Sequence, residues 1–307
     1  MRPLRFLILP IALLFLSADV LCAQELPPSA TPRGVVVAFL GETASEIDTI
    51  NRRLFEPRLV GEMGDQDVRT WRGLLPSTTT FRVDSIPRLP DDGGGPRTVA
   101  YVSVGTGRGR ESWSVFCRGD SLWRLEAIRR YPSPEQQKGI AQAIVECDTT
   151  TVGGRLRCRE LNRLSLNDDT LSAMLRTCRR DLEKVMAPLE QGRLWYNFAL
   201  DTVDFTRLEE YRELDDDISD STRIFYTLDG HALEHLKSHL GVIAVERRSA
   251  YPGVIALVLA RYEGGSIGYL RAADPSLLPV PSPTHYIMLR PVAPGWWMYR
   301  SIASDEA

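Results

Sequence analysis

The stretch VIALVLARYEGGSIGYLRA, residues 254–272, indicates how the C-terminal half of this 307-residue chain folds. Val254–Tyr262 reads as a strand that begins with the apolar run Val254–Ala260, and Ser266–Arg271 is a second strand-like segment. Glu263-Gly264-Gly265 lies between them and is typical of a hairpin turn, because glycine adopts the backbone angles that tight turns require. The stretch therefore predicts two neighbouring antiparallel strands.

More strands and helices are expected on both sides of this hairpin. We expect strands at 224–228, 242–247, 285–290 and 296–302, and helices at 167–186, 205–214 and 230–240. The helix at 167–186 has the clearest pattern, because apolar residues recur every three or four positions along one face and Pro188 follows it. That face carries Leu171, Met174, Leu175, Cys178, Leu182 and Val185.

Two segments of this half suggest a family. Asp229–Leu236 (DGHALEHL) opens a helix after a glycine, and Gly295–Ser301 (GWWMYRS) forms an exposed last strand. With the order of helices and strands over about 167–302, they make this half resemble the NTF2-like (SnoaL-like, cystatin-cone) superfamily. The resemblance implies a curved antiparallel sheet packed on helices around a cone-shaped apolar pocket. The proline-rich segment 273–284 departs from the compact form of that fold.

The cone would make several aromatic and polar side chains candidates for a ligand pocket. These candidates are Trp296, Trp297, Tyr299 and His231. For the aromatic residues, packing in a protein core is the alternative. Members of the superfamily include enzymes, small-molecule binders and interaction modules, so the fold alone does not select a function.

The N-terminal half predicts a smaller α+β meander. We expect strands at 35–40 and 99–104, a helix at 43–55 and a helix that begins at Ser133-Pro134. Two further strands follow from the alternation of Trp113, Val115 and Cys117 and of Trp123, Leu125 and Ala127. The Gly-x-Gly-x-Gly segment at 105–109 is interpreted as a hairpin turn, because a phosphate-binding loop would be followed by a helix. The expected fold is therefore α+β, with one domain at 35–160 and a second, NTF2-like domain at 161–307.

The N-terminus has the three-part layout of a secretory signal peptide. A basic head, Met1–Arg5, precedes the apolar run Phe6–Leu16, and small residues lead to a cleavage site after Ala23. The run is shorter than the roughly 20 residues of a membrane span. We therefore expect a signal peptide at 1–23, an exposed leader at 24–34 and a soluble, exported bacterial protein, in the periplasm or outside the cell.

Export affects how the cysteines are interpreted. Cys117, Cys147, Cys158 and Cys178 remain after the signal peptide, and an even number in an exported chain favours disulfides over free buried thiols. We expect Cys147–Cys158 to close a local hairpin and Cys117–Cys178 to join the two halves, although other pairings remain open.

The net charge of −3 argues against binding to nucleic acid. The excess of arginine over lysine is interpreted as the composition of a GC-rich genome.

Three histidines at four-residue spacing form the main metal candidate. His231, His235 and His239 lie along one side of the expected helix, and His231-x-x-Glu234-His235 matches the inverted zincin pattern. Such residues could bind zinc or sense pH. The alternative is that they lie between the apolar and polar faces of an ordinary helix, and we expect no cofactor.

A second catalytic-looking pattern is Gly264-Gly265-Ser266-Ile267-Gly268, with Asp274 and His285 in the order of a serine hydrolase. A nucleophile elbow requires a strand, a sharp turn and then a helix, whereas a strand is expected after this glycine pair. The hairpin interpretation is therefore preferred. The acidic run 215–220 lacks the spacing of a calcium loop and is interpreted as a solvated linker.

These observations predict an exported, non-enzymatic module that binds a small apolar ligand or a protein partner. One alternative is a metal-binding protein or metal-dependent hydrolase that uses the three histidines. A second alternative is an NTF2-like enzyme whose pocket is the active site.

Overall fold

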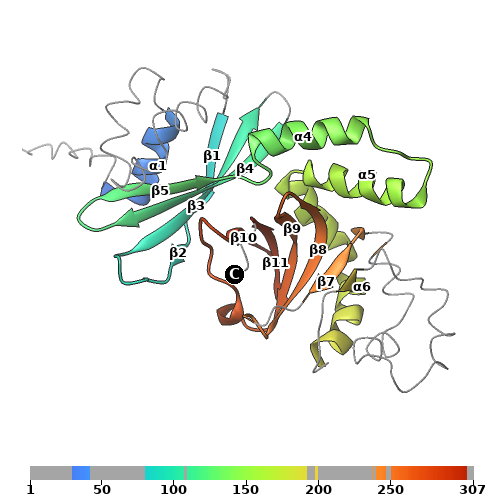
Figure 1. The fold of residues 1–307 in the computed structure, drawn as a ribbon. Helices are drawn as coiled ribbons and strands as arrows, with labels where there is room; N and C mark the ends of the chain where they lie inside the picture. The colour runs from blue at the N-terminus through green and yellow to red at the C-terminus, as the bar shows by residue number, and fades with distance from the viewer. Residues whose placement is uncertain are drawn as a thin grey trace, which may run out of the picture.

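The structure is a computed structural model that describes residues 30–41, 80–106, 109–191, 198–199, 237, 240–246 and 250–302. These residues form two antiparallel sheets and several helices, so the chain has the predicted α+β class (Figure 1). The strand order is β1-β3-β4-β5 in the first sheet, where β2 also pairs with β3, and β10-β11-β9-β8-β7-β6 in the second. Two sheets of this kind each need a covering layer, because each has an apolar face.

In the first half, up to residue 129, the described residues form one helix and the strands of the first sheet. Its elements are α1 (Pro32–Gly41), β1 (Thr80–Ser85), β2 (Arg88–Leu89), β3 (Arg97–Thr106), β4 (Gly109–Gly119) and β5 (Trp123–Arg129). The strands β3, β4 and β5 follow one another as a meander, as predicted. Alternate residues of β3 lie on opposite faces of this sheet: Ala100, Val102 and Val104 pack with α1, whereas Val99 and Tyr101 belong to the core shared with the second sheet.

The strand predicted at 35–40 is wrong, because this segment forms the helix α1. Thr31 caps the helix by accepting a hydrogen bond from the Gly34 amide at 3.0 Å. Its buried side chains recur at helical spacing and pack against the first sheet, while Val37 is 50% exposed. The buried residues are Val35, Val36, Phe39 and Leu40. The valine run favours a strand locally, and burial against the sheet overrides that preference.

From residue 134 onward, the described residues form three α-helices and the strands of the second sheet. The helices are α4 (Pro134–Val145), α5 (Val152–Leu164) and α6 (Asp168–Gln191). The strands are β6 (Phe198–Ala199), β7 (Ala244–Glu246), β8 (Val254–Tyr262), β9 (Gly265–Ala272), β10 (Tyr286–Ala293) and β11 (Trp296–Ser301), with the short 3-10 helix η5 (Pro275–Leu277) between β9 and β10.

Most of these elements match the sequence analysis. The strands β8 to β11 were predicted, and Glu263, Gly264 and Gly295 have the positive φ values of tight turns. The helix α4 begins with the predicted Ser133 cap, which forms a reciprocal capping box with Gln136.

The helix α6 is also present, but it continues through Pro188 to Gln191. The prediction that Pro188 ends it is therefore wrong. The helices predicted at 43–55 and 205–214 and the strand at 224–228 lie outside the described residues.

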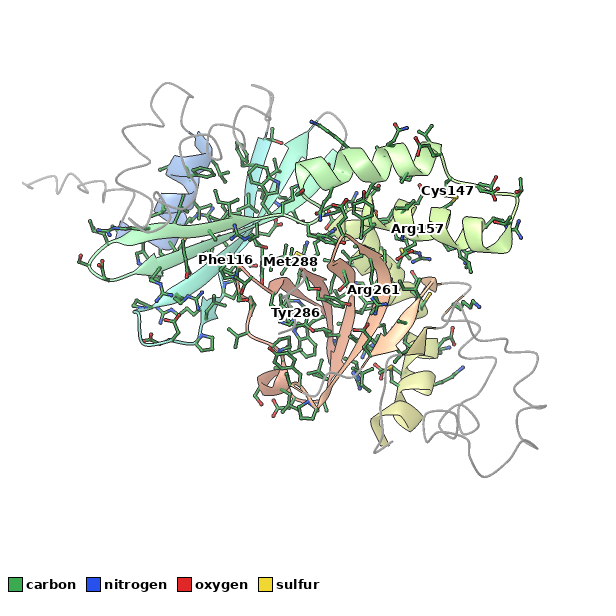
Figure 2. The ribbon with its side chains drawn as sticks, in the orientation of Figure 1. Phe116, Cys147, Arg157, Arg261, Tyr286 and Met288 are labelled. Carbon is green, nitrogen blue, oxygen red and sulfur yellow. A yellow bond between two sulfur atoms is a disulfide. The ribbon has the colours of Figure 1, made fainter. Side chains whose placement is uncertain are left out.

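The two sheets share one core. Phe116 from the first sheet and Met288 from the second belong to the same buried cluster, and Figure 2 shows them where the sheets approach each other. The Leu289 amide, on the edge strand β10, donates a 3.0 Å hydrogen bond to the Tyr101 hydroxyl of β3. Burial raises the pKa of Tyr101 to about 12. Apolar packing therefore joins the two sheets, and the Tyr101 hydroxyl accepts a hydrogen bond from a backbone amide of the edge strand β10.

A buried ion pair holds α6 against the second sheet. Arg300 donates to Asp168 Oδ1 from Nη2 at 2.7 Å and from Nε at 3.1 Å, and the two side chains are 6% and 4% exposed. Arg300 also donates to the carbonyl oxygens of Tyr131 and Leu166. The arginine thus ties the start of α6 and the chain before α4 to β11.

The predicted Cys147–Cys158 disulfide is present, with the two Cα atoms 5.7 Å apart. It closes a pair of helices, because residues 146–151 form a short connection between α4 and α5. Asp148 accepts hydrogen bonds from Thr150 in that connection, and Thr151 caps α5 by accepting from the Gly154 amide. The predicted hairpin is therefore helical.

The predicted Cys117–Cys178 disulfide is wrong, because both cysteines are free. Cys117 lies on β4 among the residues that pack with α1, whereas Cys178 lies on α6 beside the shared core. The first sheet separates these two positions. Burial raises the pKa of the Cys117 thiol to about 12.

The predicted border between domains, at residues 160 and 161, falls inside α5. Both α4 and α5 contribute to the core under the second sheet, through Ile140, Cys158, Leu161 and Leu164. The division into 35–160 and 161–307 remains a prediction about folding units.

A charged cluster stabilises the first sheet at its β2–β3 end. Asp92 accepts hydrogen bonds from both Nη atoms of Arg118 at 2.8 Å, and Arg97 donates to Glu126. The Arg118 guanidinium beside Asp92 holds the pKa of that carboxyl well below its usual range. The cluster anchors the loop before β3 to β4.

Candidate functional site

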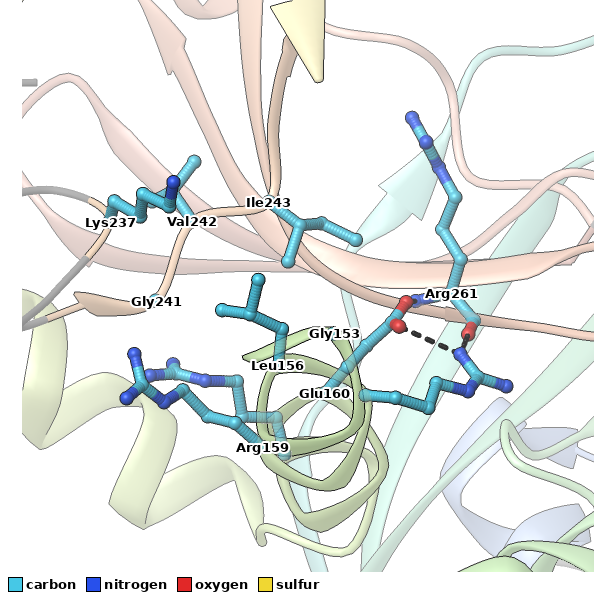
Figure 3. A pocket seen from close by; sticks show the side chains of 11 residues that line it. Gly153, Leu156, Arg159, Glu160, Lys237, Gly241, Val242, Ile243 and Arg261 are labelled. Carbon is cyan, nitrogen blue, oxygen red and sulfur yellow. Dashed lines mark hydrogen bonds and ion pairs between the residues drawn. The ribbon is translucent and has the colours of Figure 1, made fainter. Parts of the chain in front are cut away.

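A pocket of about 390 Å³ lies between α5 and the chain that leads into β7 and β8. Figure 3 shows α5 on one side and residues 241–243 on the other. Its lining combines an apolar group with several positive charges. The lining residues are Gly153, Leu156, Arg157, Arg159, Glu160, Arg163, Lys237, Gly241, Val242, Ile243 and Arg261.

Helical periodicity brings the α5 residues to this pocket. Leu156, Glu160 and Arg163 follow one another at spacings of four and three and therefore share a side of the helix. The other side of α5 packs in the protein core, where Leu161 and Leu164 are nearly fully buried. The disulfide at Cys158 and the packing of α5 on β8 hold the helix beside the sheet. The pocket wall is thus fixed at several points.

The two carboxylates found near the pocket among the described residues are already engaged. Glu160 accepts a 2.7 Å hydrogen bond from Arg157 and a 2.9 Å bond from the Arg261 amide. Glu246, which is 5% exposed, forms an ion pair with the Arg261 side chain. These contacts account for two of the basic groups, and the described lining also contains Arg159 and Arg163.

Arg163 is the most unusual residue of the pocket. Its side chain is only 7% exposed, and neither Nε nor Nη1 has a hydrogen-bond partner within the described part of the chain. Burial lowers the pKa of Arg163, and the neighbouring Arg159 lowers it further, while Tyr269 opposes the shift. The group stays protonated, because arginine retains its charge in proteins.

Gly241 makes the close approach to Arg163 possible. Its φ is +60°, which L side chains rarely adopt, and a Cβ at this position would overlap the guanidinium. The backbone of residue 241 therefore packs directly on Arg163. Within the described part of the chain, the arrangement leaves a buried cation without a neutralising partner, which is costly unless something else compensates it.

The aromatic pocket candidates do not line a common cavity. Trp296 and Tyr299 are completely buried and belong to core clusters on opposite faces of the second sheet, so they do not face one common cavity, and their role as ligand-pocket residues stays a prediction. Alternation along β11 is the reason, because neighbouring residues point to opposite faces. Trp297 lines a separate shallow hollow with Pro291 and Pro294. His231 lies outside the described residues.

The metal prediction is untested by the structure. His231, His235 and His239 all lie outside the described residues. Elsewhere, within the part that the structure describes, there is no group of three or more His, Cys, Asp or Glu residues placed to hold a metal ion. Zinc binding therefore remains an alternative based on the sequence pattern alone.

The hydrolase-like pattern forms a hairpin, in agreement with the preferred interpretation. Ser266 is a buried residue of β9, and its hydroxyl lies 2.8 Å from the Ser301 hydroxyl. Asp274 instead caps η5 by accepting a hydrogen bond from the Ser276 amide. No nucleophile elbow forms at Ser266, because the chain continues as a strand.

Sequence reasoning missed the arginines of this pocket. They were attributed to genome composition, and the segment after Cys147 was interpreted as a disulfide-closed hairpin without a helix. The available indication was the density of arginine at 157, 159 and 163, where the last two are four residues apart. Recognising its meaning requires knowing that 152–164 is a helix and that Gly241 lies against it.

No helix of the described residues is both long and apolar enough to cross a membrane. The NTF2-like resemblance rests on the sequence pattern, and the described sheet and helices support only the coarser α+β class. No protein-family model, curated protein or solved structure matches this chain.

Proposed function

We propose that the protein is an exported, non-enzymatic module that binds a small molecule with an apolar body in the pocket between α5 and β7–β8. The pocket itself carries the proposal: about 390 Å³ with Leu156, Val242 and Ile243 among its lining. Small-molecule sites typically combine an apolar lining with a few polar groups that orient the ligand.

The Cys147–Cys158 disulfide is consistent with export, because disulfides persist in oxidising compartments. Within the described residues, Ser266 is used in packing and the two carboxylates beside the pocket are held by arginines. This part of the chain therefore favours binding over catalysis.

A neutral apolar dye, N-phenyl-1-naphthylamine, tests the proposal by fluorescence titration of the purified protein. We expect a saturable increase in fluorescence that Leu156→Trp abolishes, because the indole would occupy the pocket. Leu122→Trp is the matched control, because Leu122 is 41% exposed in the β4–β5 turn, away from the pocket. Equal titrations of the two variants, or no saturable signal with the unaltered protein, would contradict the proposal.

A further inference from the structure

The strongest indication of ligand chemistry is the unsatisfied guanidinium of Arg163. Buried polar groups in proteins are nearly always hydrogen-bonded, and an exception calls for a missing partner. Here Nε and Nη1 are buried without a partner in the described residues, and Arg163 is also part of the pocket lining. A ligand in the pocket would therefore lie beside the Arg163 side chain.

We propose that the ligand carries an oxyanion, a carboxylate or a phosphate, which binds to the Arg163 guanidinium while its apolar body lies along Leu156, Val242 and Ile243. This inference rests on the proposed function and adds the chemical class of the ligand. A guanidinium presents its N–H groups as a planar fork, which matches two oxygens of such an anion.

The surrounding charges favour an anion in this position. Glu160 is held by Arg157 and by the Arg261 amide, and Glu246 is held by the Arg261 side chain. Neither carboxylate forms an ion pair or hydrogen bond with Arg163 in the described structure. Tyr269, which also acts on the charge of Arg163, donates its hydroxyl to the Leu171 carbonyl at 2.7 Å. Arg159 adds positive charge to the same lining.

Among the described residues, the wall beside Arg163 supplies no anion of its own. Gly241 packs against the guanidinium where any larger residue would overlap it, so this position offers backbone and no side chain. A buried unpaired charge lowers stability, and binding sites often retain such a cost because the ligand removes it. Arg163 is therefore expected to strengthen ligand binding and to lower the stability of the ligand-free protein.

The test compares three ligands with the same alkyl chain: octanoate, octyl phosphate and octanol. Dissociation constants are measured by calorimetry with the whole protein. We expect at least one of the two anions to bind about tenfold or more tightly than octanol, the ratio expected from a charge-assisted hydrogen-bond pair. Which anion binds more tightly distinguishes a carboxylate ligand from a phosphate ligand, and inorganic phosphate alone should bind more weakly than octyl phosphate.

Arg163→Met tests the assigned residue, because methionine keeps a long apolar stem without the charge. The preference for the anion should disappear, and the melting temperature of the ligand-free protein should not fall. Arg155→Met is the control on the same helix, since Arg155 bonds to the Thr149 and Thr150 carbonyls and is not part of the pocket lining. It should retain the preference.

Several results would overturn the inference. These are equal binding of both anions and octanol to the unaltered protein, an anion preference that survives in Arg163→Met, or a lower melting temperature of that variant. If inorganic phosphate bound as tightly as octyl phosphate, the claim that an apolar part of the ligand contributes to binding would be wrong. If Arg163→Met does not fold, Arg163→Gln replaces it, because glutamine is neutral but still polar, and an unchanged preference there would also overturn the inference.

The two proposals fail in different ways. Dye binding that depends on Leu156, together with no preference for an anion, removes only the assignment of Arg163. Loss of the dye signal and of binding by all three alkyl ligands removes the pocket as a binding site.

Discussion

Removing the Cys147–Cys158 disulfide should destabilise the protein by about 3 kcal/mol. The two cysteines are 11 residues apart, so the bond closes a short loop in the unfolded chain. The chain-entropy relation for a loop of this length gives an entropy loss of about 9 cal/mol/K, equivalent to about 2.8 kcal/mol at 25 °C. When the disulfide is removed, the native α4–α5 connection should retain the hydrogen bonds of Asp148 and Thr151. Most of the change in the free energy of unfolding therefore comes from the greater conformational entropy of the unfolded chain.

The assay is equilibrium denaturation in urea of the Cys147→Ala/Cys158→Ala double variant. Cys178→Ala is the matched control, because Cys178 is free and only partly buried, and we expect a change below about 1 kcal/mol. A reductant should lower the stability of the unaltered protein to that of the double variant and leave the double variant unchanged. A double variant within about 0.5 kcal/mol of the unaltered protein would refute the reasoning.

Thiol titration checks the pairing directly. Under denaturing conditions a chain that begins at Gln24 should show two thiols, those of Cys117 and Cys178, and four after reduction. In the folded protein Cys117 should react slowly, because burial raises its pKa to about 12. Four thiols without a reductant would contradict the disulfide.

Three further predictions concern α5, the first sheet and α1. Gly153→Ala should stabilise the protein by about 0.5–1 kcal/mol, because its Cβ would meet nothing within 4 Å, whereas Gly154→Ala should destabilise it by about 1–3 kcal/mol, because its Cβ would overlap the backbone of the preceding turn. Equal denaturation midpoints for the two would contradict this packing. The depressed pKa of Asp92 contributes stability that is present above its unfolded pKa of about 4 and is lost as the pH falls towards the lower folded value. Asp92→Asn should therefore be less stable at pH 7 and lose less stability on acidification, and an unchanged acid profile would argue against the Arg118 contact. Phe39→Ala should cost about 3–5 kcal/mol, while Val37→Ala should cost below about 0.5 kcal/mol, because only Phe39 is buried. Similar losses for both, measured by urea denaturation, would contradict a helix at 32–41.

The strands and turns of the second half were predictable because their information is local. Val254–Ala260 is a continuous apolar run, and Glu263 and Gly264 after it have the positive φ that a tight turn needs. The capping box at Ser133 is likewise contained in four consecutive residues. In each case side chains a few positions apart specify the local backbone.

The first helix shows where local information was insufficient. Val35-Val36-Val37 favours a strand by propensity, but a helix buries Phe39 and Leu40 against the first sheet. Local preference is worth a few tenths of a kcal/mol per residue, whereas burying a large apolar side chain is worth about 1.5–3 kcal/mol. The outcome therefore depends on a sheet whose first strand begins at Thr80, 39 positions after the end of the helix at Gly41.

The sequence by itself determined the α+β class, the strands and turns of 254–302, the cap of α4 and one disulfide, because each of these depends on residues close together in the chain. Only the tertiary structure decided that Cys117 and Cys178 lie on opposite sides of the first sheet, that Trp296 and Tyr299 are core residues, and that Arg163 is buried against Gly241. These features depend on contacts between segments far apart in the sequence, such as Arg163 and Gly241, which are 78 positions apart in the numbering. The pocket belongs to this second group, because a buried charge without a partner is recognised only when everything around it has been placed.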